Sequence, residues 1–200
     1  MPDPFVIEVS CEDRGHEEFI VPLVERVLRE HNLAFRSRVV SARGGASQAS
    51  AELDVLLDLI ERGKRSAPDL LVVCRDANCT GVSTRKSQIE AAVGVKWRHV
   101  LLSACPEPHV ELWYLAEQTT FTQVVGGSRV AVPSEKCERD LYKDLLRQAV
   151  TDAGQIPIND GIEFGRELAA KVDLYALGKA SASFGCFLDD LKTHVTRLEH

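Results

Sequence analysis

The sequence predicts an α/β protein in which helices cover both faces of a parallel β-sheet. Short apolar runs such as the one at residues 70–73 do not alternate with polar residues, which is typical of strands buried on both faces. Segments with apolar residues at helical spacing follow these runs, so strand and helix alternate over about the first hundred residues. This alternation favours a doubly wound sheet with right-handed crossovers.

The first part of the chain is expected to supply the strands of the sheet and the helices between them. The strands are expected at residues 5–10, 34–40, 70–73 and 97–103. A helix with an apolar stripe from Phe19 to Leu28 should end at Asn32, and a second should begin at its cap Ser47. A shorter helix is expected over residues 84–93.

The rest of the chain is expected to be helical. Pro108 should open a helix that runs through Leu115, because proline fits the first helical position. Further helices are expected at residues 135–151, at residues 162–172 and around the apolar positions from Phe184 to Val195. No Pro-, Gly- or Ser-rich linker interrupts the chain. A single domain over residues 1–200 is therefore predicted, with its sheet core at about 4–104 and a helical C-terminal portion at about 105–197.

The composition is that of a soluble globular protein, with 44% hydrophobic and 27% charged residues. No apolar run reaches the roughly 20 residues that span a bilayer, and the N-terminal segment lacks the basic region of a signal peptide. We therefore expect a cytoplasmic protein without membrane contact. The net charge of −6 argues against broad, unaided nucleic-acid binding, although it leaves room for a local basic strip.

The 6 cysteines are scattered along the chain, and none forms a C-x-x-C pair. Several fall within expected core elements. Free buried thiols are therefore favoured over disulfides or a zinc site.

Polar residues follow the run at 70–73 directly and mark a candidate site. In open parallel sheets, ligands bind beyond the carboxyl ends of the strands, so Asp76 and Asn78 should stand at the functional edge. These two side chains could bind a metal ion or a phosphate group there. The alternative is structural, because an acid or amide after a strand often caps the next helix or holds a turn.

Basic residues near this edge are candidates for contacts with a phosphate backbone: Arg43, Arg75, Arg85 and Lys86. Ordinary solvated charge is the competing interpretation. Gly44 and Gly45 before a helix suggest either a phosphate cradle or a plain turn, and the full P-loop pattern is absent.

The histidines are interpreted as surface or core residues. His16, His99 and His109 lack the spacing of a metal-binding pair. His16 and His109 nevertheless adjoin candidate acids.

Four segments carry a resemblance to a known family: residues 11–19, 76–78, 106–117 and 183–187. The first resembles the segment after strand one in TOPRIM-type proteins, where a glutamate ends the strand. The second lies where that family carries an Asp-x-Asp pair. The last two resemble the Pro-Glu…Trp-Leu-x-Ala-Asp and Ser-Phe-x-x-Phe signatures of the small bacterial TOPRIM-like family, which is related to nucleases of the overcoming-lysogenization-defect class.

The resemblance implies a Rossmann-like TOPRIM sheet and a magnesium- or manganese-dependent endonuclease. Carried over by residue, it makes Glu12 a metal ligand or general base, Asp76 the principal metal ligand and Glu111 a further catalytic acid. Asn78 would complete the metal site through its amide oxygen. Hard divalent cations prefer such oxygen ligands and stabilise the charge that develops on a phosphodiester.

Two departures from the family pattern leave alternatives open. Asp13 stands where the family has a glycine, and Asn78 stands where it has the second acid, which removes a charge from the site. In the competing interpretation, Glu12 only favours the positive end of the next helix, and Glu111 lies on a solvated helix face. Trp113 is interpreted as a core residue rather than a platform for base stacking.

The partners follow from the same resemblance. The expected function is cleavage of nucleic acid, DNA more than RNA, in an anti-phage or DNA-maintenance system beside an ATPase of the ABC or SMC type. The alternative is a non-catalytic subunit that docks on such an ATPase. Nucleotide binding without cleavage ranks behind both because no phosphate loop is visible, and self-association into a homo-oligomer stays open.

Overall fold

The computed structural model describes residues 3–134, 137–138 and 140–199, and it has the predicted α/β architecture. The strands β1 (Phe5–Cys11), β2 (Phe35–Ser41), β3 (Leu70–Cys74) and β4 (Leu101–Ala104) form one sheet in the order β2-β1-β3-β4. All neighbouring strands are parallel. The predicted Rossmann-like sheet is therefore confirmed. None of the helices in the described part of the chain is long and apolar enough to cross a membrane.

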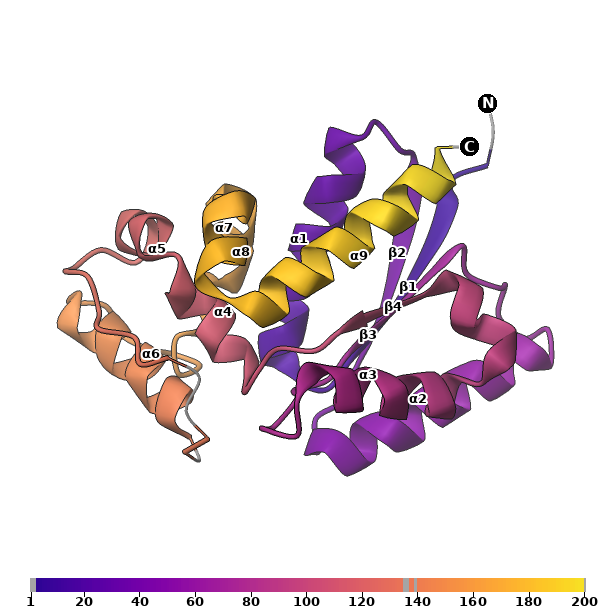
Figure 1. Cartoon of the computed structure of the whole chain (residues 1–200), viewed down its shortest axis with the longest axis horizontal. Helices are drawn as coiled ribbons and strands as arrows, with labels where there is room; N and C mark the ends of the chain where they lie inside the picture. Colours follow the sequence, from indigo (N-terminus) through magenta and orange to yellow (C-terminus); the bar gives the residue numbers. More distant parts are fainter. Residues whose placement is uncertain (1–2, 135–136, 139, 200) are drawn as a thin grey trace.

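Helices cover both faces of this sheet (Figure 1). One face packs against α1 (Arg14–Glu30) and α9 (Ala182–Leu198) through the alternate strand residues Ile7, Val9 and Val72. The opposite face packs against α2 (Gly45–Glu61), α3 (Val82–Val93) and the 3-10 helix η1 (Val95–Val100) through Leu71 and Val73. Because side chains alternate across a strand, the two strands β3 and β4 contribute to both cores.

The remaining helices gather beside the sheet (Figure 1). They are α4 (Val110–Ala116), α5 (Gln118–Val124), α6 (Leu141–Asp152), the 3-10 helix η2 (Ile162–Phe164), α7 (Gly165–Lys171) and α8 (Leu174–Ala180). Residues from α4, α6, α7 and α8 belong to the same hydrophobic core as α1 and α9. The predicted additional C-terminal helices are thus present and packed onto the sheet layer.

Several predicted boundaries are corrected by the structure. Pro108 does not open a helix: the Glu107–Pro108 peptide bond is cis, and α4 begins at Val110 after the N-cap His109. The strand expected over 97–103 is divided into η1 and the shorter β4. Helix α2 begins before Ser47, with Gly44 at the N-cap. The helix expected over 135–151 is described from Leu141, while residues 135, 136 and 139 lie outside the described residues.

The cysteine prediction is wrong for one pair, because Cys79 and Cys137 form a disulfide. It joins the loop after β3 to the segment before α6. Cys11, Cys74 and Cys105 are buried free thiols as expected, and Cys186 is a free, exposed thiol.

Trp113 is a core residue, as expected, and it joins two segments that are far apart in the sequence. Its ring stacks on Phe187 and meets Phe184 edge-on, with centroids 5.4 and 5.1 Å apart. Its indole Nε1 donates a hydrogen bond of 2.9 Å to Ser183 Oγ, which also accepts from the backbone N–H of Glu107. The segment 106–117 and the segment 183–187 therefore form one packing unit, and that unit holds the loop that carries His109.

Candidate functional site

The predicted acids at the ends of β1 and β3 lie together. The two strands are neighbours, with Cys11 paired in register with Cys74. Glu12 and Asp76 follow these residues, and the backbone N–H of Asp76 donates to Glu12 Oε2 at 3.1 Å. Both side chains are largely buried, although each belongs to a strongly hydrated residue type. The carboxyl edge of the sheet is thus the place where charged groups converge.

Asp76 lies between two histidines. His16 Nε2 is 3.0 Å from Asp76 Oδ1 at an angle too poor for a hydrogen bond, so this contact is an ion pair. His109 Nδ1 lies 3.2 Å from Asp76 Oδ2, and the backbone N–H of Val110 donates to Oδ1 at 2.9 Å. Both carboxylate oxygens therefore have partners inside the protein.

A second acid lies on the far side of His16. Asp13 is the N-cap of α1, and its Oδ1 accepts from the backbone N–H of His16 at 3.1 Å. The same oxygen lies 2.8 Å from His16 Nδ1. His16 is 0% exposed, whereas the Asp13 carboxylate is half-exposed. The result is a continuous chain of groups, Asp13–His16–Asp76–His109, that runs from the surface through a buried imidazole and back toward the surface.

The neighbouring charges shift the pKa values of these groups in a consistent direction. Burial disfavours charged His16, but Asp76 and Asp13 outweigh it and hold the pKa of His16 well above its ordinary value. The hydrogen bond with Asp76 raises the pKa of His109. Burial likewise opposes the charged carboxylates, yet His16 lowers the pKa of Asp76 and brings the pKa of Asp13 to about 2. Asp13 and Asp76 are thus held toward their charged forms on either side of His16, and they favour the protonated form of His16.

Glu111 joins this group from the first turn of α4. Burial, with the nearby charge of Asp76 as the next cause, raises the pKa of Glu111 to about 7. The same two causes raise the pKa of Glu12. The charge of Asp76 therefore acts on both other acids predicted to be catalytic, and Glu12 and Glu111 are held closer to the neutral form than ordinary carboxylates.

Asn78 is exposed and occupies a turn. Its φ of 48° is left-handed, a conformation that asparagine tolerates. The backbone N–H of Asn78 donates to the carbonyl of Pro108 at 3.0 Å, and its side-chain amide reaches back to the carbonyl of Asp76 at 3.5 Å. Asn78 thus helps to hold the loop that carries His109.

The predicted phosphate-binding residues occupy four different environments. Arg75 is 5% exposed, and its guanidinium donates to the carbonyls of Ser10, Cys74 and Ala49 and to Ser10 Oγ. Lys86 is ion-paired with Asp190. Arg85 is partly buried and donates to Gln88, while Arg43 is exposed beside a cavity of about 700 Å³ that Asp13 also lines. A phosphate contact by any of them stays a prediction, and Arg43 is the most accessible.

The arrangement does not fit the divalent cation that the TOPRIM resemblance implies. Among the described residues, no group of three or more His, Cys, Asp or Glu side chains is placed to hold a metal ion. The oxygens of Asp76 face His16, His109 and the N–H of Val110, and one oxygen of Glu12 accepts from the backbone of Asp76. A cation would have to displace these partners before it reached Asp76.

Sequence reasoning missed the histidines as members of the site. His16 comes from α1 and His109 from the N-cap of α4, so their spacing along the chain carries no sign of their contact with Asp76. The available signal is Asp13 before the first helix, since a cap residue contacts the residue three positions later.

No protein-family model, curated protein or solved structure matches this chain. The TOPRIM resemblance consequently rests on the residues quoted for it alone.

Proposed function

We propose that this chain cleaves phosphodiester bonds in nucleic acid, with His109, held by Asp76, as its general base and Glu111 as its general acid. The main support for the proposal is the geometry of His109. Its Nδ1 faces the buried carboxylate of Asp76, and its side chain remains 26% exposed. A carboxylate that fixes one imidazole nitrogen leaves the other nitrogen for proton transfer, which is a recurrent arrangement in hydrolases.

The proposed reaction uses residues of the same edge. His109 Nε2 accepts the proton of the attacking water or hydroxyl group as its oxygen bonds to phosphorus. The bond to the leaving oxygen breaks, and that oxygen takes a proton from Glu111, whose pKa of about 7 keeps part of its population protonated near neutral pH. His16 and Asp13 hold Asp76 in its charged form from the other side.

The test is cleavage of supercoiled plasmid and of single-stranded RNA by the purified chain, with and without a chelator. His109→Gln should lower the rate about 100-fold or more, in line with the loss of one acid–base group. His99→Gln is the matched control, because His99 is exposed on η1 and has no role in the site. Equal activity of both variants would refute the role of His109.

The magnesium or manganese dependence implied by the resemblance is tested in the same assay. Cleavage that appears only with added metal and is lost in both Glu12→Gln and Asp76→Asn would support the metal-dependent reaction instead. Cleavage that persists with chelator and depends on His109 would support the acid–base reaction.

A second candidate is the non-catalytic subunit of a partner ATPase. The observation that favours it is that Asp76 and Arg75 are both engaged inside the protein, so neither is free to meet a substrate. The net charge of −6 also favours reliance on a partner for DNA contact. A chain that is inactive alone on both substrates and with both metals, yet binds an ATPase of the ABC or SMC type, would support this candidate.

A further inference from the structure

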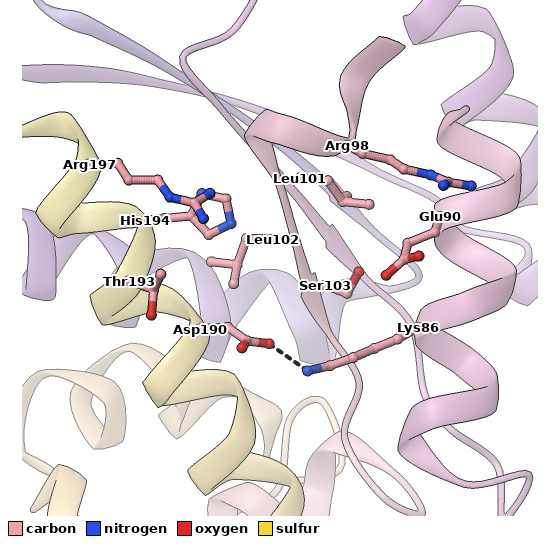
Figure 2. Close-up of a pocket in the computed structure, with 10 residues that line it drawn as sticks. All are labelled: Lys86, Glu90, Arg98, Leu101, Leu102, Ser103, Asp190, Thr193, His194 and Arg197. Carbon is pink, nitrogen blue, oxygen red and sulfur yellow. Dashed lines mark hydrogen bonds and ion pairs between the residues drawn. The ribbon is translucent and has the colours of Figure 1, made fainter. Parts of the chain in front are cut away.

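A second pocket lies on the flank of the sheet where β4 forms the edge (Figure 2). Its volume is about 300 Å³, at the lower end of the range for small-molecule sites. Leu101, Leu102 and Ser103 of β4 line it, together with side chains from α3, η1 and α9. None of the residues that form the Asp76 site lines this pocket.

An ion pair spans the pocket and links its two helical walls. Lys86 on α3 and Asp190 on α9 are in contact across the space between the helices (Figure 2). Both side chains are only partly exposed, with 25% and 48% of their surface accessible. This pair neutralises Lys86 and links α3 to α9 across the pocket.

Two arginines supply the unpaired positive charge. Arg98 on η1 and Arg197 near the end of α9 both line the pocket, and the described part of the chain gives neither side chain an ion pair or hydrogen bond. Guanidinium groups bind phosphate and carboxylate oxygens through paired N–H donors. The two side chains lie on opposite sides of the pocket, Arg197 beside His194 and Arg98 directed toward α3 (Figure 2), so each can meet an anionic group on its own wall.

The pocket also contains groups that could accept hydrogen bonds from the hydroxyl or amino groups of a ligand. Glu90 on α3 lines it without an ion pair among the described residues, and the hydroxyls of Ser103 and Thr193 lie on the floor and on the α9 wall. His194 is half-buried and close to Arg197; burial and that charge lower the pKa of His194, so its imidazole is neutral near pH 7. A neutral imidazole offers either a donor or an acceptor to a ligand.

We propose that this pocket binds a small phosphomonoester with free hydroxyl groups, of the size of a mononucleotide or a sugar phosphate. Arg197 meets the phosphate from the α9 wall, and Glu90 on the α3 wall accepts hydrogen bonds from the sugar hydroxyls (Figure 2). The inference rests on this pocket alone and does not depend on the proposed cleavage reaction.

The test is calorimetric titration of the full chain with adenosine monophosphate, ribose 5-phosphate, adenosine and inorganic phosphate. Both phosphomonoesters should bind, adenosine should not, and inorganic phosphate should bind about tenfold or more weakly than ribose 5-phosphate, because it lacks the hydroxyls that Glu90 accepts from. Arg197→Gln should weaken the binding of both esters about tenfold or more, as expected for the loss of a charge-assisted hydrogen bond.

Lys192→Gln is the matched control, because Lys192 is exposed on the same helix and does not line this pocket. Glu90→Gln should weaken ribose 5-phosphate and leave inorganic phosphate unchanged. Absence of binding by either ester, or equal losses in Arg197→Gln and Lys192→Gln, would overturn the proposal.

Discussion

At the scale of single residues, Asp76 is the centre of the candidate site. It receives a backbone N–H from Val110, faces imidazoles from two helices and is tied to Glu12 through its own backbone. These partners come from separate parts of the chain, so Asp76 contributes to stability as well as to chemistry. A change at this position should therefore be visible in unfolding experiments, independently of any activity.

Replacing the Asp76 carboxylate with an amide should destabilise the protein strongly. Asp76→Asn leaves His16, which is 0% exposed, without its main countercharge. Breaking a buried pair from one side costs about 3–5 kcal/mol, and urea unfolding would measure the loss. Asp58→Asn is the control, because it removes an exposed pair with Arg62 that should be worth less than about 1 kcal/mol. Similar losses in the two variants would contradict the buried ion-pair network.

The stability that His16 supplies should depend on pH with a defined sign. The pKa of His16 is raised above its ordinary value of 6.5 by Asp76 and Asp13 against the effect of burial. Its contribution is therefore complete below about pH 6.5 and is lost as the pH rises through the higher pKa of the folded state. The difference in unfolding free energy between the wild type and His16→Gln should be larger near pH 6 than near pH 9. A constant or increasing difference would show that His16 is not held as an imidazolium ion.

Sequence reasoning located the acids of the site but not their partners. Glu12 and Asp76 could be placed because the ends of neighbouring parallel strands meet at one edge, a rule that needs only the strand assignments. The histidines could not be placed, since His16 depends on the orientation of α1 and His109 on a loop with a cis peptide bond. Both are tertiary features without a periodic signal in the sequence.

At the scale of elements, the packing of α7 on α1 depends on one close approach. A Cβ atom added to Gly165 would lie 2.9 Å from the backbone carbonyl of Glu18 and would collide with the hydroxyl of Tyr114. That hydroxyl already donates to the carbonyl of Gly15 at 2.8 Å, so it cannot move away without losing its acceptor. Glycine therefore permits α1, α4 and α7 to meet at this point.

Gly165→Ala should lower the free energy of unfolding by about 1–3 kcal/mol, the usual cost of overpacking a core. Gly178→Ala on α8 is the control, because its added Cβ would make an ordinary contact of 3.5 Å with Gly185. That variant should be neutral or more stable by up to about 1 kcal/mol, since alanine favours the helix. A neutral Gly165→Ala in chemical denaturation would contradict the close approach.

The predicted helices agree with the structure where the periodic pattern of apolar residues extends over several turns. Helices α1 and α9 each span 17 residues and show several turns of one apolar face. Helices α5 and α8 have 7 residues each and were missed, because two turns do not establish a period. The strand expected over residues 97–103 is shorter than predicted. Its first part is the 3-10 helix η1 and only its second part is β4, and both lie within one short apolar run of the sequence.

At the scale of the whole molecule, the disulfide joins the sheet edge to the helical portion. Cys79 follows the site loop and Cys137 precedes α6, 58 residues later. Closing a loop of this size removes about 4 kcal/mol of chain entropy from the unfolded state by the loop-closure estimate, and measured effects are often about 2–4 kcal/mol. The bond therefore restrains the loop that contains Asn78.

Cys137→Ser should lower the free energy of unfolding by about 2–4 kcal/mol under non-reducing conditions and have no effect under reducing ones. Cys186→Ser is the matched control, because Cys186 is a free and exposed thiol. Its replacement should change stability by less than about 0.5 kcal/mol. Identical denaturation curves for Cys137→Ser and the wild type without reductant would show that the bond does not form in solution.

The position of α9 in the sequence has a consequence for synthesis of the chain. The strands of the described sheet are complete by Ala104, but one face of that sheet is covered partly by α9, which follows about 80 residues later. At about 5–20 residues per second, the ribosome needs roughly 4–16 s to reach Phe184 after Ala104. Throughout that interval the nascent sheet presents an apolar face, so we expect a chaperone to hold it. Ribosome-bound chains stopped at residue 172 should bind a chaperone that the full chain, once released from the ribosome with α9 folded, does not bind.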